Sequence, residues 1–323
     1  MRVAAYVGGV LGLGLLVTLM VRADFTSMLH TLVLAGWRLL WLVPYRTLFF
    51  LLYALGWLIL LQPYNGQRRA GLGYVFWVTA VREAIDRLLP VASVGGGVAA
   101  VRLLRWRGLP GAAVAASVVT EVLLTLIVAY VFTALGLMLL LRLNDTGSDF
   151  HRLLLVFALS LPVPAATILL LRYGSVFERL FRYLRPLVGA GALAEGAASL
   201  DEELRASLRR GWALTRAGAL QLAAFVSGAF EVWFALRLFG HPVGIEVALV
   251  LESMTQAVRH LAFVVPAALG VQEAGLMVFG HAFGISSELA LAVSMAKRLR
   301  ELLCGLPPLL SWQWLEGRRL QVD

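Results

Sequence analysis

The chain has 323 residues, of which 60% are hydrophobic and 15% charged, and its mean hydropathy is +0.83. A soluble protein of this size cannot bury so much apolar surface, so the composition excludes a soluble globular enzyme and predicts an all-α polytopic membrane protein. The net charge of +9 does not indicate nucleic acid, because the arginines border apolar runs and are typical of topology signals and lipid-headgroup contacts. The single cysteine, Cys304, excludes an internal disulfide and a cysteine metal cluster.

The first part of the chain alternates apolar runs with short polar turns. Residues 3–21 and 45–61 are each long enough to cross a bilayer, so we expect two spans there. Residues 25–41 place apolar side chains at helical spacing and end near two tryptophans, which is typical of a helix lying in the membrane interface. Residues 21–23 resemble a signal-peptide cleavage site, but the preceding run is long for a signal, so we favour a retained helix.

Residues 74–104 combine apolar sequence with charges and helix-breaking residues. Four charged side chains within residues 82–87 come before Pro90, and three consecutive glycines follow it. Proline cannot continue a regular helix, and glycine relaxes the backbone. We therefore predict a helix that enters the membrane, breaks near Pro90 and returns to the side from which it came.

The remaining apolar runs predict four more spans, at residues 112–141, 153–171, 217–236 and 289–310. Residues 172–216 form the only sizeable polar section, and we expect a cytoplasmic section with interfacial helices there. This section would join two halves of a single transmembrane domain that covers residues 1–323, the halves being about 1–171 and 217–323.

The most polar of the membrane-length stretches is Glu252 to Gly275. It is interrupted by Pro266 and Gly270, and its five polar or charged residues of interest are Glu252, Gln256, Arg259, Gln272 and Glu273. In lipid, a broken helix is tolerated only where its freed backbone groups face protein or a watery cavity. Ionisable groups at that depth are costly and mark a pathway or site. We interpret this stretch as half of a substrate cavity.

The basic residues predict the orientation of these segments. With six spans and two broken segments that return to their own side, most of the 28 lysine and arginine residues fall on the face of the N-terminus. The positive-inside rule then places both termini in the cytoplasm. The segment around Pro90 would enter from the cytoplasm and the segment around Pro266 from the opposite face. Such an inverted repeat of broken hairpins indicates a midplane transport site; two unrelated kinked helices are the alternative.

Twelve embedded polar residues are our candidates for substrate binding: Arg82, Glu83, Glu231, Glu252, Gln256, Arg259, Gln272, Glu273, Lys297, Arg298, Arg300 and Glu301. Some are spaced for pairing within one helix, as Arg298 is with Glu301, Arg82 with Asp86 and Glu83 with Arg87. Both readings stay open for each of them, since a buried charge can be a structural ion pair or a ligand for substrate.

The sequence offers little for cofactor chemistry. It contains no nucleotide loop of the GxxxxGK[ST] type, and its five histidines are scattered without metal-ligand spacing. No nucleophile stands beside a matching base at recognisable spacing, so we expect neither an enzyme nor a bound cofactor or metal.

Several motifs of the chain resemble those of a known group of membrane proteins. LLPVASVGGG followed by AVRLLRWRG resembles the signature of the flippase-like transmembrane domain of lysylphosphatidylglycerol synthases. GAFEVWFAL, ESMTQAVRHLAFVVPAALGVQEAG and AKRLRELLCGLPPLLSWQ resemble the hopanoid-biosynthesis-associated membrane proteins of the HpnL type more closely still. The resemblance implies movement or placement of a lipid, for the HpnL type a hopanoid, in a bacterial inner membrane. It also implies functional roles for these positions: Glu231, Glu252, Arg259, Gln272, Glu273, Lys297, Arg298, Arg300 and Glu301. The family often carries an acidic residue where this chain has Gly97.

Taken together, these features favour a lipid transporter that flips a hopanoid or related amphiphile through a polar midplane cavity. Arg259 and the basic residues of 297–300 would bind headgroup oxygens, while Glu252 and Glu273 would orient them or carry coupled protons. The alternatives are an intramembrane enzyme that modifies a lipid headgroup and a scaffold for hopanoid-biosynthesis enzymes that docks them on residues 172–216. Biosynthesis or export proteins are candidate partners, a homo-oligomer is compatible with the sequence, and no nucleic-acid partner is expected.

Overall fold

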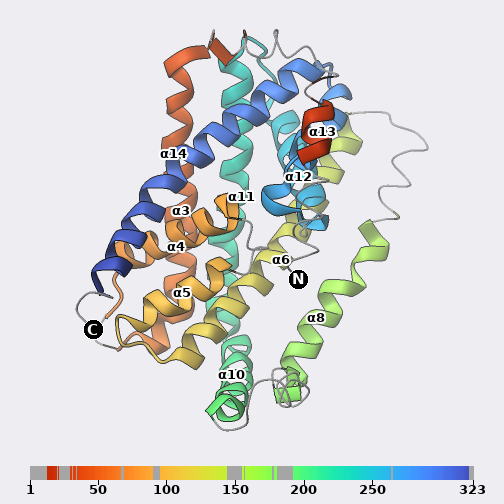
Figure 1. The fold of residues 1–323 in the computed structure, drawn as a ribbon. Helices are drawn as coiled ribbons and strands as arrows, with labels where there is room; N and C mark the ends of the chain where they lie inside the picture. The colour runs from red at the N-terminus through yellow and green to blue at the C-terminus, as the bar shows by residue number, and fades with distance from the viewer. Residues whose placement is uncertain are drawn as a thin grey trace.

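The computed structural model describes residues 13–19, 21, 30, 32–33, 35–66, 69–89, 95–143, 155, 157–176, 178–179, 192–262 and 265–319. Every regular element within these ranges is helical (Figure 1). In chain order, the elements whose bounds are described are η1 (Gly36–Trp41), α3 (Leu42–Leu61), η2 (Gln62–Tyr64), α4 (Leu72–Leu88), α5 (Gly95–Arg105), α6 (Gly111–Leu143), α8 (Pro162–Tyr173), α10 (Ala192–Arg209), α11 (Gly211–Leu238), α12 (Ile245–Leu261), η4 (Pro266–Ala268), α13 (Val271–His281) and α14 (Ser287–Arg319).

Three helical segments are long and apolar enough to cross a membrane: Gly36–Tyr64, Gly111–Leu143 and Gly211–Leu238. They contain three of the six predicted spans, so the chain is an integral membrane protein. α14 matches α6 in length, but basic and acidic residues at positions 297–301 interrupt its apolar sequence. The span predicted at 153–171 corresponds to a shorter apolar helix, Phe157–Tyr173. The span predicted at 3–21 lies largely outside the described residues.

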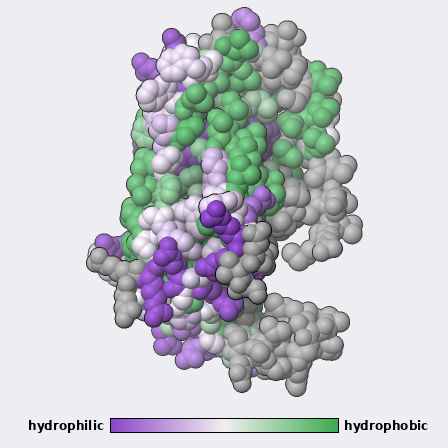
Figure 2. Space-filling model, turned by 60° about the vertical axis from the view of Figure 1, so that its left-hand side comes forward, coloured by the Kyte–Doolittle hydropathy of each residue, from purple (hydrophilic) through white to green (hydrophobic). Residues whose placement is uncertain are grey.

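The surface supports the membrane assignment. Figure 2 shows an apolar band across one face, between hydrophilic zones above and below it. Tryptophans lie at the ends of the long helices, and Trp37, Trp41, Trp212 and Trp314 are all exposed. Tryptophan and tyrosine favour the membrane–water interface, because most of each side chain is apolar while its N–H or O–H group forms a hydrogen bond with water.

Two antiparallel helical hairpins lie at opposite ends of the bundle. In Figure 1, α4 and α5 occupy the lower part of the molecule, while α12 and α13 occupy the upper part. In the first hairpin the Tyr74 hydroxyl donates to the Leu103 carbonyl at 2.7 Å, so the start of α4 lies beside the end of α5. In the second hairpin, α13 packs closely on α12, because a Cβ atom added to Gly275 of α13 would lie 3.5 Å from Thr255 of α12.

The two connections differ in how much of them can be described. The break predicted around Pro90 lies outside the described residues, although α4 ends at Leu88 and Leu89 is already extended. The break around Pro266 is a short 3-10 turn in which Ala267 and Ala268 have φ values of 53° and 48°. Left-handed backbone costs an alanine roughly 1–2 kcal/mol, so neighbouring contacts must hold this loop in place.

Among α3, α4, α5, α6, α11, α12, α13 and α14, each contact between helices has a counterpart. α3 packs against α11, α4 packs against α14, and α12 packs against α6. Likewise α3 contacts α4 as α11 contacts α12, and α5 contacts α6 as α13 contacts α14. Exchanging α3, α4, α5 and α6 for α11, α12, α13 and α14 therefore leaves the set of contacts unchanged.

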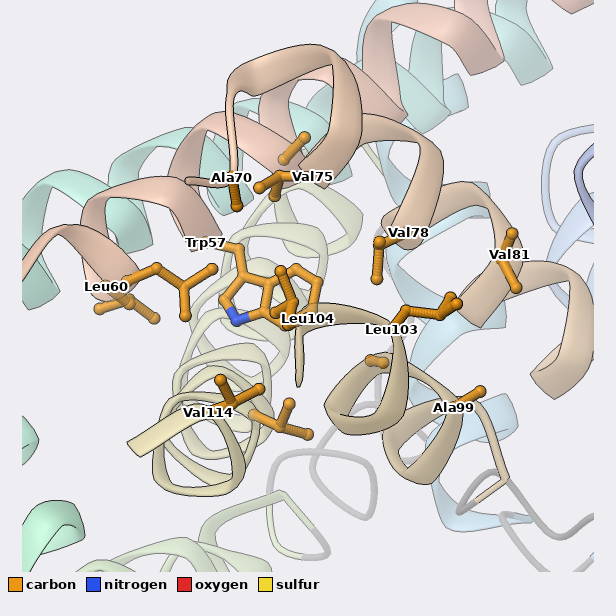
Figure 3. Packing of buried hydrophobic residues seen from close by; sticks show 14 of the residues in the cluster. Trp57, Leu60, Ala70, Val75, Val78, Val81, Ala99, Leu103, Leu104 and Val114 are labelled. Atoms are coloured by element: carbon orange, nitrogen blue, oxygen red, sulfur yellow. The ribbon is translucent and has the colours of Figure 1, made fainter. Parts of the chain in front are cut away.

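Each hairpin is anchored by its own apolar core. Around the first, Trp57 of α3 is fully buried among residues of α4, α5 and α6, including Val75, Leu104 and Val114 (Figure 3). Its indole Nε1 donates to Ser117 Oγ at 3.1 Å, which satisfies the one polar atom of the ring. A second cluster around the other hairpin joins η1, α3, α11, α12, α13 and α14.

The polar section at 172–216 contains the long helix α10 and the start of α11, which begins at Gly211, before the predicted position 217. α10 packs on α6, and its Leu204 is fully buried. The Tyr64 hydroxyl donates to Glu203 at 2.7 Å and accepts from Arg210 at 3.0 Å. This section is thus tied to the end of α3 and to α6.

Candidate functional site

The embedded charges gather where the C-terminal part of α4, in the first hairpin, approaches the C-terminal part of α12, in the second. A cavity of about 400 Å³ lies between α4, α6, α12 and the loop after α12. Its polar wall consists of Tyr53, Thr79, Arg82, Glu83, Asp86, Arg87, Glu121, Thr125, Gln256, Arg259 and His260. Its apolar wall includes Val122 and Leu126 of α6 together with Ala262 and Val265 of the loop. Val122 is 52% exposed, so this wall of the cavity reaches the outer surface of the bundle.

On the α4 side, each charge has a partner from another turn or helix. Arg82 forms an ion pair with Glu121 of α6. The pair of Arg82 with Asp86, which the spacing of four residues made possible, does not form. Glu83 accepts from Arg46 of α3 and lies 3.0 Å from Arg87 Nε, which confirms the predicted pair four residues apart. The Asp86 carboxylate accepts from the Gly96 backbone amide at 3.0 Å and thereby links α4 to the start of α5.

On the α14 side the pairs are more deeply buried. Lys297 Nζ lies 2.5 Å from Glu252 Oε2, and the other oxygen of that carboxylate accepts from Gln256 at 2.9 Å. Arg300 Nε lies 3.0 Å from Glu231 of α11. Lys297 and Arg300 are only 1% and 3% exposed. Their carboxylate partners must therefore compensate for the hydration that both cations lose on burial.

Arg298 holds the broken loop. Its Nη1 donates to the Ala267 carbonyl at 2.7 Å and its Nη2 to the Ala268 carbonyl at 3.2 Å. Its Nε lies 3.2 Å from Glu273, and Glu301 is 3.4 Å away, so the predicted pair of Arg298 and Glu301 is confirmed. A planar guanidinium can satisfy several carbonyls at once, which fits it to hold the two left-handed alanines in place.

Arg259 is a buried cation on the cavity wall that keeps unused hydrogen-bonding capacity. Its Nη1 donates to Gln272 Oε1 at 2.6 Å, while its Nη2 has no hydrogen-bond partner among the described residues and lies 3.8 Å from Glu301. Gln272 in turn donates to Ser294, and Ser294 donates to Glu273. Arg259 lines both the 400 Å³ cavity and a pocket of about 50 Å³ beside it.

The formal charges of this group cancel. It contains seven basic residues (Arg46, Arg82, Arg87, Arg259, Lys297, Arg298, Arg300) and seven acidic residues (Glu83, Asp86, Glu121, Glu231, Glu252, Glu273, Glu301). An unpaired ion at this depth would cost several kcal/mol. The balance lets the chain keep polar groups in the membrane without a net buried charge.

The structure separates the twelve predicted site residues into groups. Arg82, Glu83, Gln256 and Arg259 line the 400 Å³ cavity. Glu231, Glu252, Lys297, Arg300 and Glu301 line the 50 Å³ pocket, which Gln256 and Arg259 also reach. Arg298 lies with Glu301 on a third space of about 320 Å³, across the loop from the cavity. Gln272 and Glu273 line none of these three spaces and support Arg259 and Arg298 from behind.

Sequence reasoning omitted several residues of the cavity wall. Asp86 and Arg87 follow Arg82 and Glu83 at helical spacing, so the same face of α4 could have been extended to them. Glu121 is the only charged residue in a long apolar run, which by itself marks a functional or paired position. Tyr53 and Thr125 carry no such signal, because similar residues occur throughout membrane helices.

Among the described residues no group of three or more histidine, cysteine, aspartate or glutamate side chains is placed to hold a metal ion. Comparison with curated proteins and with solved structures found no match. A family model did match, that of the lysylphosphatidylglycerol synthase TM region, and the match extends over residues 6–307. This covers nearly the whole chain, including both hairpins and the charged group between them. The chain therefore belongs to the family of the lysylphosphatidylglycerol synthase transmembrane region.

Proposed function

We propose that this protein moves an amphiphilic lipid between the two leaflets of a bacterial inner membrane, the lipid being a hopanoid or a related molecule. The observation that carries the proposal is the 400 Å³ cavity, which has a charged wall and lies in a membrane domain between two helical hairpins. Ionisable side chains are costly at this depth and are found where a polar substrate passes. We choose a hopanoid because motifs such as GAFEVWFAL resemble those of the HpnL type.

The packing pattern supports an inverted repeat as the framework. The contacts among α3, α4, α5 and α6 have counterparts among α11, α12, α13 and α14, and the two hairpins lie toward opposite ends of the bundle. We propose that both hairpins are re-entrant, that the complete chain has six spans and that both termini are cytoplasmic. Transporters of this design bind substrate at the interface of the repeats.

The cavity wall suggests how a lipid would be accommodated. The headgroup would lie among Arg82, Glu83 and Arg259, while the tails would leave past Val122 into the bilayer. Because the surrounding formal charges cancel, a neutral or zwitterionic headgroup would exchange hydrogen bonds there without adding net charge. Arg259 Nη2 is a donor on the cavity wall that has no hydrogen bond to any described residue.

We propose transport and not headgroup chemistry as the activity. Biosynthesis or export proteins would deliver or receive the lipid, and a gradient of ions or of the lipid itself would drive it. The two activities leave different traces, because a transporter changes the leaflet of the lipid while an enzyme changes its structure.

The test is a leaflet-exchange assay in proteoliposomes containing a labelled hopanoid with a polar headgroup. Arg259→Ala removes charge-assisted hydrogen bonds of about 1.5–3 kcal/mol each, so we expect exchange to slow by about tenfold or more. The matched control is Arg237→Ala, which removes an exposed arginine from the last turn of α11, away from the cavity. This variant should exchange lipid as the wild type does.

Two further measurements accompany the assay. Thermal unfolding of both variants verifies that Arg259→Ala remains folded although Gln272 loses its donor. Mass analysis of the lipid after exchange tests for chemical change. Equal exchange by Arg259→Ala and wild type would refute the assignment of the cavity, and a chemically altered headgroup would favour the enzyme alternative.

A further inference from the structure

A second cavity lies at the lower end of the bundle, separate from the charged group between the hairpins. It has a volume of about 650 Å³ and is formed where α4 begins, α5 ends and α14 ends. Its wall combines the aromatic side chains Tyr74, Trp77 and Trp106 with Arg107, Arg318 and Arg319. It shares no lining residue with the 400 Å³ cavity.

The arginines of this rim cavity are stacked on aromatic rings. The guanidinium carbon of Arg107 lies 4.4 Å from the centre of the Tyr74 ring, and that of Arg319 lies 4.2 Å from Trp106. Arg318 stacks on Trp314 at 3.8 Å. A stacked guanidinium is held in place by its face and keeps its edge N–H groups free to donate, which prepares it to bind an oxyanion.

These three cations differ from the basic residues between the hairpins. Within the described ranges, no carboxylate lies within 4 Å of Arg107, Arg318 or Arg319. Glu316 lies on the same part of α14, but it is paired with Arg102. Three like charges around one hollow repel one another, and an anion between them would relieve that repulsion.

The surroundings indicate which anion. Trp77 is fixed by donating its indole N–H to Ser311 at 2.9 Å, and it borders the apolar Leu315. Tryptophan, tyrosine and arginine together are typical of the level of the lipid headgroups. Figure 2 shows hydrophilic residues gathered below the apolar band on the side where the C-terminal part of α14 lies. The cavity is thus at the edge of the membrane belt, with one apolar and one charged wall.

We propose that this rim cavity binds the phosphate of an anionic membrane lipid in the leaflet at the C-terminal end of α14. Arg107 and Arg319 contact the phosphate oxygens, Arg318 adds charge at the entrance, and the acyl chains follow the apolar surface beside Leu315. The bound lipid joins the end of α5 to the end of α14 and stabilises the first hairpin. This inference does not depend on which lipid the protein transports.

The experiment measures thermal unfolding of the purified full-length protein in a zwitterionic detergent. Three ligands are titrated at matched ionic strength: phosphatidylglycerol, phosphatidylcholine and inorganic phosphate. We expect phosphatidylglycerol to raise the unfolding temperature saturably and the other two to leave it unchanged. The double replacement Arg107→Gln/Arg319→Gln should raise the phosphatidylglycerol concentration needed for half of the maximal rise by about thirtyfold. This is the loss expected for two basic residues, each worth about 1 kcal/mol at an anionic surface.

Arg142→Gln/Arg237→Gln is the matched control, because it removes the same charge from exposed positions at the ends of α6 and α11. It should retain the wild-type response. If Arg107→Gln/Arg319→Gln does not fold, Arg318→Gln takes its place, since Arg318 stacks on the exposed Trp314 and its loss should still weaken the response. A response to phosphatidylglycerol that these replacements leave intact, or an equal response to inorganic phosphate, overturns the proposal.

Discussion

At the scale of single residues, the choice between lysine and arginine is informative. Lys297 is the only lysine in the sequence, and it occupies one of the most buried positions of the chain. Arginine carries several donors in a wide planar fork, whereas the lysine ammonium is compact. A single carboxylate oxygen 2.5 Å away from Nζ matches a compact ammonium.

We predict that Lys297→Met lowers the free energy of unfolding by about 3–5 kcal/mol, because Glu252 then remains buried and unpaired. Glu252→Gln should have a cost in the same direction. The double variant should cost much less than the sum of the two single changes, since neither charge is left alone. Unfolding in detergent, followed for all four proteins, gives the coupling energy directly, and additive costs would mean that the pair contributes no coupling.

The residue scale also shows where a sequence pattern is sufficient and where it is not. Glu83 with Arg87 and Arg298 with Glu301 were predictable because both members lie on one helix face. Arg82 with Glu121 and Lys297 with Glu252 join different helices, so their choice depends on the tertiary arrangement of those helices. The sequence could therefore identify which groups are embedded, but not which of them the cavity leaves available for a substrate.

At the scale of helices, glycine decides how closely the long helices approach the hairpins. Gly136 of α6 faces α12, where an added Cβ atom would lie 1.8 Å from Ser253 Oγ. Gly305 of α14 faces α4, where an added Cβ would lie 2.8 Å from Leu88. These are corresponding contacts in the exchange of halves, and small residues at helix crossings are the usual means of close packing in membranes.

We predict that Gly136→Ala destabilises the protein by about 1–3 kcal/mol, because the added methyl group overpacks the contact with Ser253 of α12. Gly317→Ala serves as the control, because nothing lies within 4 Å of a Cβ atom there and alanine favours the helix. Adding Ser253→Gly to Gly136→Ala should restore part of the loss. Thermal unfolding in detergent is the measurement, and equal stability of the two alanine variants would contradict the close approach.

The loop between α12 and α13 gives a second prediction at this scale. Arg298→Gln removes the donors that hold the carbonyls of Ala267 and Ala268, each bond being worth about 1.5–3 kcal/mol. Amide hydrogen exchange in residues 265–270 should accelerate by about tenfold or more, while exchange in α10 stays unchanged. Arg105→Gln, at an exposed position, is the control. Unaltered exchange in the loop would show that its left-handed backbone is held by other contacts.

At the scale of the whole molecule, the sequence predicted the elements better than their arrangement. Apolar runs located the three helices that can span the membrane, because helix length and hydropathy are local properties. The turn at Pro266 was predictable because proline stops a helix, and α4 likewise ends at Leu88, just before Pro90. How the hairpins meet could not be predicted, because it depends on α6 and α14 crossing obliquely between them (Figure 1).

This arrangement makes a prediction about the two faces of the membrane. If α4 and α5 form a re-entrant hairpin, Gln62 and Arg105 must lie on one face, and Pro242, between α11 and α12, must lie on the other. Single cysteines at these three exposed positions, in a Cys304→Ser background, can be treated with a membrane-impermeant maleimide in spheroplasts. The basic end of the molecule is expected in the cytoplasm.

Pro242→Cys should therefore react at once, and Gln62→Cys and Arg105→Cys only after permeabilisation. Reaction of Gln62→Cys and Arg105→Cys from opposite faces would mean that the first hairpin crosses the bilayer, and a cavity between two inverted hairpins would then be impossible.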